Sequence, residues 1–270
     1  MTDFLCPVCK KTLSRRENSL KCPGGHCFDI SRKGTVNLLL SGKAHHGDDK
    51  RMVAARKAFL DSGKYYPLMR EICKLAVKYA PQNVTLLDCG CGECSYTAAV
   101  SEALRSAGKK HEVIGIDVSK EAINAGASRH ADIRLAAASV FDIPLPAESC
   151  DIVLALFSPF SGAEYLRVLK KGGFYITAFP LEEHLFELKQ AVYDHPYKNT
   201  VSDLAVEGFD LAENGGCRFS VELQSNPEII SLFEMTPYCY KTSRSDRAKL
   251  DSLESLTVRA EFGTAVYRKL

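Results

Sequence analysis

The chain has 270 residues, of which 46% are hydrophobic and 25% charged, an ordinary composition for a globular protein. This length predicts one large domain with a smaller module, and no apolar run approaches the roughly 18 residues of a membrane-spanning helix. The N-terminus also lacks the basic-then-apolar pattern of a secretion signal, so we expect a cytoplasmic protein that has no membrane partner.

The formal net charge of +2 is unevenly spread along the chain. Residues 1–57 hold 12 Lys and Arg against 5 Asp and Glu, whereas the remainder holds 23 against 28. A basic arm on a mildly acidic body is typical of proteins that bind a polyanion. A solvated surface without a partner is the alternative that charge alone leaves open.

Four metal-binding side chains crowd the first segment. Cys6 and Cys9 form a Cys-x-x-Cys pair, and Cys22 and His26 form a Cys-x-x-x-His pair. Together they can hold one tetrahedral zinc ion with no open position, which stabilises a module too small to build its own core. Cys27 is a rival fourth ligand, but we favour His26 because Cys27 is adjacent to it and is expected to point elsewhere. The sequence thus predicts a zinc-binding module over residues 1–40, with short strands at 19–21 and 36–40.

The next segment predicts a helical linker over residues 41–80. Residues 41–48 are polar and lack hydrophobic periodicity. A helical pattern follows over 49–60, and Gly63 is a C-cap signal. A second helix is predicted from Pro67, a favoured first-turn residue, to about residue 79.

Residues 81–270 alternate between strand-like and helix-like segments. This pattern favours an α/β fold with a parallel sheet covered by helices on both faces. The tail predicts helices over 226–234 and 246–253 and a closing antiparallel strand over 257–268. The buried strands are expected at 84–88, 113–117, 133–137, 152–156 and 174–178, and the amphipathic helices at 95–107, 120–128, 162–169 and 182–191.

The loop after the first of these strands carries the strongest chemical signal. The strand ends at Asp88 and turns through Gly90 and Gly92 into a helix, so the backbone can approach a ligand closely. Asp117 ends the next strand, where a carboxylate can accept both hydroxyls of a ribose. A dinucleotide-binding loop has a third glycine where Ser95 stands. An acid two positions before Gly-x-Gly instead favours a Rossmann-like methyltransferase that uses S-adenosylmethionine; a glycine-rich turn of another α/β protein is the alternative.

In order and spacing, these motifs resemble the 23S ribosomal RNA guanine-N1 methyltransferases, a group that includes some macrolide-resistance enzymes. The resemblance runs from Cys6 almost to the C-terminus and includes segments 28–39, 56–65, 182–189 and 235–238. Two positions depart from the family: Thr35 replaces an aromatic residue, and Cys94 replaces the last glycine of the cofactor loop.

The resemblance implies roles for single residues. Tyr65 and His184 match residues that contact the cofactor, and Gly92 and Glu93 match the pair that lies against its methionine part. The implied ligands are S-adenosyl-L-methionine and Zn²⁺, and the implied partner is 23S ribosomal RNA. A homodimer is a further expectation about partners.

The segment after the fourth strand is where related enzymes hold the target base. It offers Ser158, Pro159 and Phe160, and the ring of Phe160 can stack on a guanine. A plain hydrophobic turn is the alternative, and the sequence identifies no general base. The expected reaction is methylation of N1 of a guanine in a 23S ribosomal RNA hairpin; a small-molecule methyltransferase and a non-catalytic RNA-binding protein are the competing functions.

Overall fold

The computed structural model of the chain describes residues 3–40, 47–130, 132–201 and 203–270. Within these residues, strands β1, β2 and β3 form a small sheet, and the other eight strands form a large one in the order β10-β11-β9-β8-β5-β6-β7-β4. The strands are β1 (Ser14–Arg16), β2 (Ser19–Lys21), β3 (Cys27–Asp29), β4 (Val36–Asn37), β5 (Asn83–Cys89), β6 (Lys110–Asp117), β7 (Arg134–Ala137), β8 (Cys150–Leu156), β9 (Leu169–Pro180), β10 (Phe209–Leu223) and β11 (Leu256–Lys269). The helices are α1 (Lys50–Asp61), α2 (Tyr66–Tyr79), α3 (Ser95–Ser106), α4 (Lys120–Ala127), α5 (Gly162–Val168), α6 (Phe186–Val192), α7 (Asn226–Glu234), α8 (Arg244–Ala248) and the 3-10 turns η1 (Pro237–Tyr240) and η2 (Lys249–Ser252).

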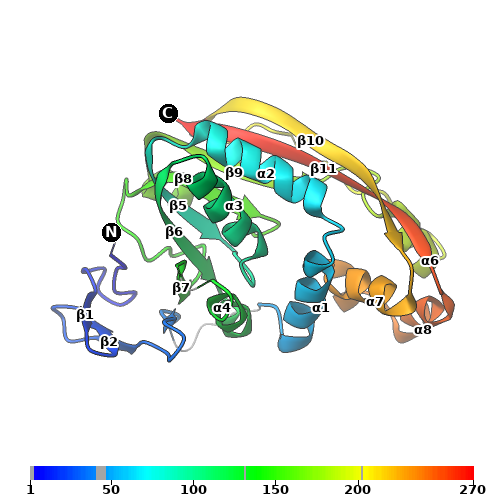
Figure 1. Ribbon diagram of the computed structural model, residues 1–270, viewed down its shortest axis with the longest axis horizontal. Coiled ribbons are helices and arrows are strands. Elements are labelled where there is room, and N and C mark those ends of the chain that lie inside the picture. Colours follow the sequence, from blue (N-terminus) through cyan, green and yellow to red (C-terminus); the bar gives the residue numbers. More distant parts are fainter. Residues whose placement is uncertain (1–2, 41–46, 131, 202) are drawn as a thin grey trace.

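The small sheet lies at one end of the long axis of the molecule, and α6, α7 and α8 lie at the other (Figure 1). The N-terminal segment is tied to the large sheet by its backbone. The amide of Leu5 donates to the carbonyl of Pro144 over 2.9 Å. β4 pairs in parallel with β7, with Val36 opposite Ala136. The predicted strand over 36–40 therefore covers only two residues, and it extends the large sheet.

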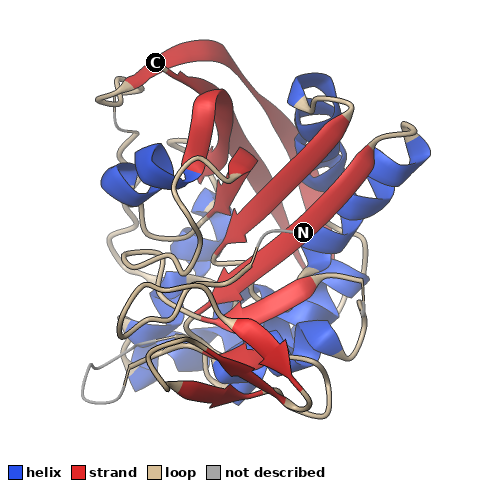
Figure 2. Ribbon diagram, turned by 90° about the vertical axis from the view of Figure 1, so that its left-hand side faces the viewer, coloured by secondary structure: helices blue, strands red, loops and turns tan. Residues whose placement is uncertain are grey.

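The large sheet confirms the predicted α/β fold. β4 to β9 of this sheet pair in parallel, and β10 and β11 add an antiparallel edge. Helices cover both faces, as Figure 2 shows from the side of the N-terminal segment. The strand order reverses between β5 and β8, and in open α/β sheets this is where the carboxyl ends of the strands leave a crevice for a ligand.

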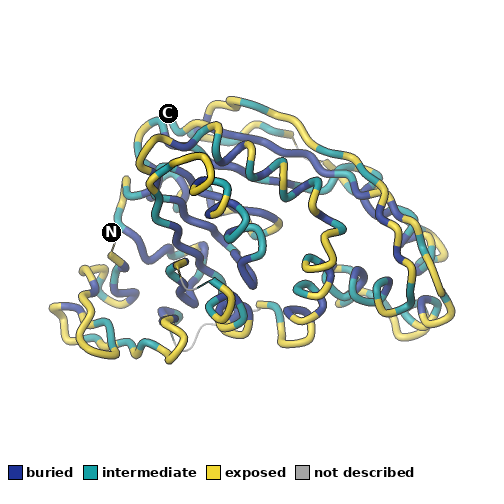
Figure 3. Tube along the Cα trace, viewed as in Figure 1, coloured by how far each residue is buried: buried dark blue, intermediate teal, exposed yellow. Residues whose placement is uncertain are grey.

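The alternation of side chains along the strands divides the core into two apolar layers. One layer joins Leu86 of β5 to α2, α3 and α7; the other joins Leu87 to α5 and to the N-terminal segment through Phe4 and Leu13. The central strands are buried along their length, whereas β10 is exposed over much of its course (Figure 3). The N-terminal segment thus shares a core with the large sheet.

The two linker helices, α1 and α2, lie close to their predicted bounds, and the cap and glycine signals of α1 have the expected geometry. Asp49 caps α1 by accepting a hydrogen bond from the amide of Met52 over 2.9 Å. Gly63 follows α1 with a φ of +76°, a conformation that glycine adopts without a steric penalty. No helix of the described ranges is both long enough and apolar enough to cross a membrane.

Three predictions about the C-terminal part were wrong or incomplete. The helix expected over 182–191 begins only at Phe186, because Leu185 has a left-handed φ of +55° that ends the preceding turn. The helix expected over 246–253 is divided into α8 and η2. β10 was not predicted. Its first half is polar and contains two glycines, and the alternation of apolar and polar residues over 217–223, which is a strand signal, was overlooked; the whole strand pairs in antiparallel fashion with β11.

Candidate functional site

A cavity of about 660 Å³ opens at the carboxyl ends of the central parallel strands. Its walls come from the linker, the loops after β5, β6, β7 and β8, and the C-terminal part. It brings together all seven cofactor residues expected from the sequence: Tyr65, Asp88, Gly90, Gly92, Glu93, Asp117 and His184.

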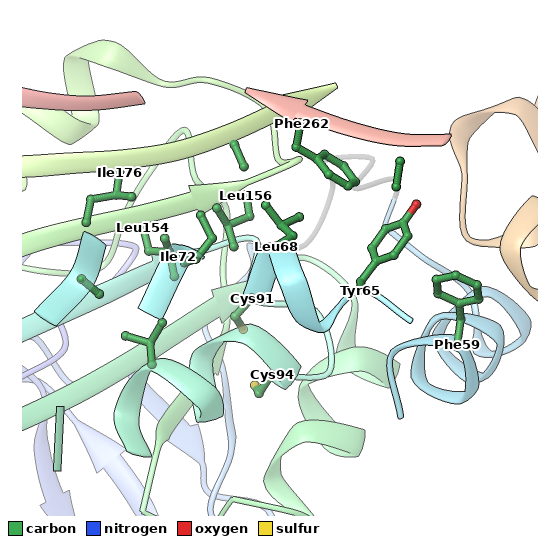
Figure 4. Packing of buried hydrophobic residues seen from close by; sticks show 14 of the residues in the cluster. Phe59, Tyr65, Leu68, Ile72, Cys91, Cys94, Leu154, Leu156, Ile176 and Phe262 are labelled. Carbon is green, nitrogen blue, oxygen red and sulfur yellow. The ribbon is translucent and has the colours of Figure 1, made fainter. Parts of the chain in front are cut away.

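The loop after β5 forms the floor of the cavity. Gly90 has a φ of +80°, and a Cβ atom there would lie 2.4 Å from Cβ of Ser158. The position therefore requires glycine both for its backbone angle and for space. Cys94, at the position of the family's last glycine, is buried and has a φ of +70°. Figure 4 shows Cys91 and Cys94 in this loop beside the apolar core.

Asp117 links the ends of two neighbouring strands. Its Oδ2 accepts a hydrogen bond from the amide of Gly92 over 3.0 Å, and its Oδ1 accepts one from the amide of Ser119 over 2.8 Å. Burial raises the pKa of this carboxyl. Each oxygen has a further lone pair, so the carboxylate can accept two hydroxyl groups from a ligand while it holds the loop in place.

Two more carboxyl groups are buried beside the loop. Oδ2 of Asp88 accepts a hydrogen bond from Oγ1 of Thr97 over 2.6 Å, and Oε1 of Glu93 accepts one from Oγ of Ser95 over 2.5 Å. Burial raises the pKa of Asp88 to about 7. A cationic ligand near Asp88 would favour its ionised form.

An aromatic wall faces the loop. Figure 4 shows the ring of Tyr65 between Phe59 and Phe262, with ring centroids 5.0 Å and 5.3 Å away. The ring of His184 also packs on Phe262, at 4.3 Å. Nδ1 of His184 accepts a hydrogen bond from the amide of Glu261 over 3.1 Å, so the neutral ring carries its proton on Nε2. Burial lowers the pKa of this histidine to about 3, which keeps the ring neutral.

The expected base-pocket residues are only partly brought together. Ser158 and Pro159 line the cavity, and Oγ of Ser158 donates to the carbonyl of Cys89 over 2.7 Å. Phe160 is not among the lining residues; its ring packs 5.6 Å from Tyr165 and 5.8 Å from Tyr175. Phe157 lines the cavity in its place.

Phe157 combines two unusual features. Its φ is +58°, a strained angle for a bulky residue, and its side chain remains 51% exposed at the cavity. Such strain is often found at functional sites. The sequence shows two phenylalanines in this turn, and it does not indicate which of them lines the cavity.

Sequence reasoning also missed several lining residues. Arg56 and segment 235–238 lay within motifs that carried the family resemblance, but they received no role. Tyr96 directly follows the cofactor loop but received no role. Asp48 and Asn199 gave no signal, because each comes from a segment whose approach to the loop depends on the tertiary fold. Arg56 forms an ion pair with Asp48 at the cavity.

The charges of the lining residues discriminate between cofactors. Four carboxyl groups line the cavity, those of Asp48, Asp88, Glu93 and Asp117, and Arg56 is the one Lys or Arg among the described lining residues. A cleft dominated by one sign of charge attracts ligands of the opposite sign. S-adenosylmethionine, with a sulfonium, an ammonium and one carboxylate, carries net positive charge and fits this cavity; the two phosphates of NAD do not.

The second candidate site lies in the N-terminal segment. One ligand atom from each of Cys6, Cys9, Cys22 and His26 lies within 4.8 Å of all the others. Nδ1 of His26 is 3.4 Å from the sulfur atoms of both Cys6 and Cys22. These separations suit a tetrahedral zinc ion with bonds of about 2.0–2.3 Å. Cys27 is exposed and lies outside the cluster.

The chain around this cluster leaves room for an ion. A Cβ atom on Gly24 would lie 3.3 Å from the sulfur of Cys9 and 3.5 Å from that of Cys22. A side chain at this position would therefore crowd the ligands. Three sulfurs and one imidazole nitrogen are a donor set typical of structural zinc.

Two protein families match separate parts of the chain. Residues 4–42 match a zinc ribbon family described as "RlmA, N-terminal", and residues 86–173 match one described as "Methyltransferase domain". The first match spans the Cys and His cluster, and the second includes the loop after β5. The chain therefore combines a zinc ribbon with a methyltransferase domain that uses S-adenosylmethionine.

Relatives that cover most of the chain agree with these matches. A candidate 23S rRNA (guanine-N(1)-)-methyltransferase of Micromonospora griseorubida is 30% identical over 98% of this chain and 97% of its own length. The 23S rRNA (guanine(748)-N(1))-methyltransferase of Streptomyces fradiae is 34% identical over 74% of this chain and 73% of its own length. The solved structure of the YcgJ protein from Bacillus subtilis shares the fold, with a TM-score of 0.50 and 15% identity over 74% of this chain and 98% of that one. With its zinc ribbon, its methyltransferase sheet and relatives that are 30% and 34% identical, the chain belongs to the family of 23S rRNA guanine-N1 methyltransferases.

Proposed function

We propose that this protein transfers the methyl group of S-adenosylmethionine to N1 of a guanine in a 23S ribosomal RNA hairpin. The observation that carries this proposal is the acidic cavity at the switch point of the sheet, bordered by the exposed ring of Phe157. The relative from Streptomyces fradiae is named for this reaction at one guanine of 23S rRNA.

The cofactor is held by residues of the loop and of the aromatic wall. Asp117 accepts the ribose hydroxyls, and Gly90 and Gly92 let the backbone approach the ligand. Asp88 and Glu93 attract the positive charge of the methionine part, and Tyr65 and His184 close the opposite side. The lining of one cavity by all these residues supports the assignment.

The cofactor supplies an electrophilic methyl group when it is bound. The protein must place N1 of guanine in line with that methyl group, so positioning provides much of the rate. Guanine N1 lies on the Watson–Crick edge, and the base must leave its stack to reach the cavity. We assign Phe157 as the ring that stacks on the extruded base, with Ser158 and Pro159 beside it.

The N-terminal module binds zinc for its own stability and offers positive charge to the RNA. Cys6, Cys9, Cys22 and His26 hold one zinc ion, which keeps the small sheet folded. Arg15 and Arg16 lie on the exposed strand β1 and are suited to contact RNA phosphates. We propose a division into an RNA-recognition module over 1–40, a linker over 41–80 and a catalytic domain over 81–270; residues 41–46 of that linker lie outside the described ranges.

Two further expectations stay predictions. A ribosomal RNA substrate places the protein in the cytoplasm, and cell fractionation tests this. A homodimer is measured by analytical ultracentrifugation of the full chain.

The test of function is a methylation assay on a short 23S ribosomal RNA hairpin over a series of salt concentrations. The double variant Arg15→Ala with Arg16→Ala should weaken RNA binding and reduce its salt dependence. Binding releases fewer counterions from the RNA when the protein makes fewer phosphate contacts. Cofactor affinity should remain unchanged. The matched control is Lys74→Ala with Arg105→Ala, which removes one exposed cation of the linker and one of the catalytic domain.

Phe157→Ala should produce the opposite result, with RNA binding retained and methyl transfer slowed. Phe160→Ala is its matched control, since Phe160 does not line the cavity and its ring packs on Tyr165 and Tyr175. If neither arginine affects RNA affinity at any salt concentration, a small-molecule substrate becomes the better proposal. Detection of the methylated nucleotide at a position other than guanine N1 would contradict the reaction.

A further inference from the structure

Two residues that line the cavity carry buried hydroxyl groups without a hydrogen-bond partner. Within the described ranges, the buried side-chain oxygen atoms without a partner are the hydroxyls of Tyr65 and Tyr96. Both residues line the cavity. Buried polar atoms are nearly always hydrogen-bonded in folded proteins, so two unpaired hydroxyls in one cavity indicate a ligand that pairs with them.

The two hydroxyls lie in a common environment. Burial raises the pKa of Tyr65 well above its ordinary value, and the charge of an ionised Tyr96 would raise it further. Burial also raises the pKa of Tyr96. The negative charge of Glu93 raises this pKa further, and the positive charge of Arg56 lowers it. Both phenols therefore remain protonated and can donate hydrogen bonds, with Glu93 and Arg56 as charged neighbours of Tyr96.

Arg56 brings positive charge to this end of the cavity. It reaches over from α1, and its Nη1 lies 3.7 Å from the position that a Cβ atom on Gly92 would take. Its ion pair with Asp48 holds it at the wall. The carboxyl groups of Asp88 and Glu93 lie on the loop itself, so this end of the cavity contains both signs of charge.

We propose that Tyr96 and Tyr65 donate hydrogen bonds to the α-carboxylate of the cofactor, with Arg56 supplying the positive charge beside it. This inference rests on the proposed function, because it takes S-adenosylmethionine as the ligand. The ammonium of the same amino-acid group is attracted by the carboxylates of Glu93 and Asp88, which attract a cation more strongly than a neutral phenol does. The carboxylate of the cofactor therefore pairs with the donors that remain, the two neutral hydroxyls and the guanidinium of Arg56.

The experiment compares two ligands that differ in this one group. Isothermal titration calorimetry is performed with S-adenosylmethionine and with decarboxylated S-adenosylmethionine, which keeps the sulfonium and the ammonium. Tyr96→Phe should weaken binding of S-adenosylmethionine by about 10- to 100-fold, the effect of losing one hydrogen bond to a charged group. Its affinity for the decarboxylated ligand should change by less than about 2-fold, because no contact is lost.

Two controls separate this role from a structural one. Tyr79→Phe removes a hydroxyl that bonds to Glu213 and does not line the cavity, so neither ligand should bind differently. In the ligand-free protein, Tyr96→Phe should leave the melting temperature unchanged or raise it, because the deleted hydroxyl has no partner. A lowered melting temperature together with equal losses for both ligands would show a structural role and overturn the proposal.

The remaining outcomes are also distinct. Equal weakening of both ligands at an unchanged melting temperature would assign the hydroxyl to the ammonium and overturn the carboxylate assignment. Unchanged affinity for S-adenosylmethionine would overturn the inference and leave the proposed function intact. If the unaltered protein bound neither ligand, the proposed function and this inference would fail together.

Discussion

The N-terminal zinc ribbon and the methyltransferase domain are stabilised in different ways. Within residues 3–40, the buried apolar positions besides cysteines are Phe4, Leu13, Val36 and Leu38, too few for an independent core. The methyltransferase domain buries whole strands and the inner faces of its helices. The small region therefore depends on its metal ligands, whereas the large one depends on apolar burial.

The zinc ribbon nevertheless shares its apolar packing with the methyltransferase domain. The four apolar residues of the ribbon belong to the same buried layer as β5, β6 and β8, and β4 extends the large sheet. The ribbon is thus closed by its metal and attached by the neighbouring core. Loss of the metal should therefore destabilise the zinc ribbon alone. A substitution in the shared apolar layer should destabilise both the ribbon and the methyltransferase domain.

The largest loss of stability should come from Cys6→Ser, which removes a zinc ligand from the ribbon. Structural zinc in small modules contributes roughly 10–16 kcal/mol of binding free energy, and removing one thiolate forfeits much of it. Metal analysis should show loss of the single zinc, and hydrogen exchange should show loss of protection within 3–40 while β5 stays protected. Cys27→Ser is the matched control and should retain the zinc. Zinc retained by Cys6→Ser would refute the ligand assignment.

The next largest loss of stability should come from truncating a side chain of the apolar layer that the two regions share. Ile114 of β6 is fully buried there, and truncation to alanine should lower the free energy of unfolding by about 2–5 kcal/mol. Denaturant titration measures the loss, and hydrogen exchange should show it in both regions. Val8→Ala, at an exposed position of the ribbon, should change stability by less than about 0.5 kcal/mol. A loss confined to the large sheet would show that the ribbon is held by its metal alone.

Asp88 makes the stability of the methyltransferase domain depend on pH. Burial raises its pKa in the folded state from 3.8 to about 7. A raised carboxyl pKa contributes stability below the unfolded value, which is lost as the pH rises through the folded value. Relative to Asp88→Asn, the unaltered protein should lose up to about 4 kcal/mol between pH 4 and pH 8. Thermal unfolding of both proteins without cofactor, at several pH values, gives the difference.

Asp132→Asn is the control for that series, since it removes an exposed carboxyl group outside the cavity. A cationic cofactor should reduce the trend, because it stabilises the ionised carboxylate. A constant difference between the two Asp88 proteins across this range would show that the carboxyl titrates normally.

The smallest effect should come from the exposed ion pair between the two regions. Lys10 of the ribbon pairs with Asp142 of the methyltransferase domain, and both side chains are largely solvated. Lys10→Ala should cost no more than about 1 kcal/mol, because exposed ion pairs gain little over solvent. Denaturant titration at low and high salt checks this. A larger loss would mean that this pair, and not the shared layer, attaches the ribbon.

Local spacing in the sequence determined much of this protein. Three features are each determined by residues close together in the sequence: the loop from Asp88 to Gly92, the Cys and His pairs, and the ends of the linker helices. Residue spacing, helix caps and glycine backbone angles act directly over such short separations. The α/β sheet followed from alternating apolar segments, each of which needs a partner layer. These features could be predicted because their physical causes act over short distances along the chain.

Other features were decided by the tertiary structure alone. The first half of β10 is polar and contains glycines, and it becomes a strand because it pairs with β11. Phe157 lines the cavity and Phe160 does not, because the ring of Phe160 packs on Tyr165 and Tyr175. Tyr96 gained its significance only when folding buried its hydroxyl without a partner. Each depends on groups far apart in the sequence, and their burial and pairing arise only when the chain has closed.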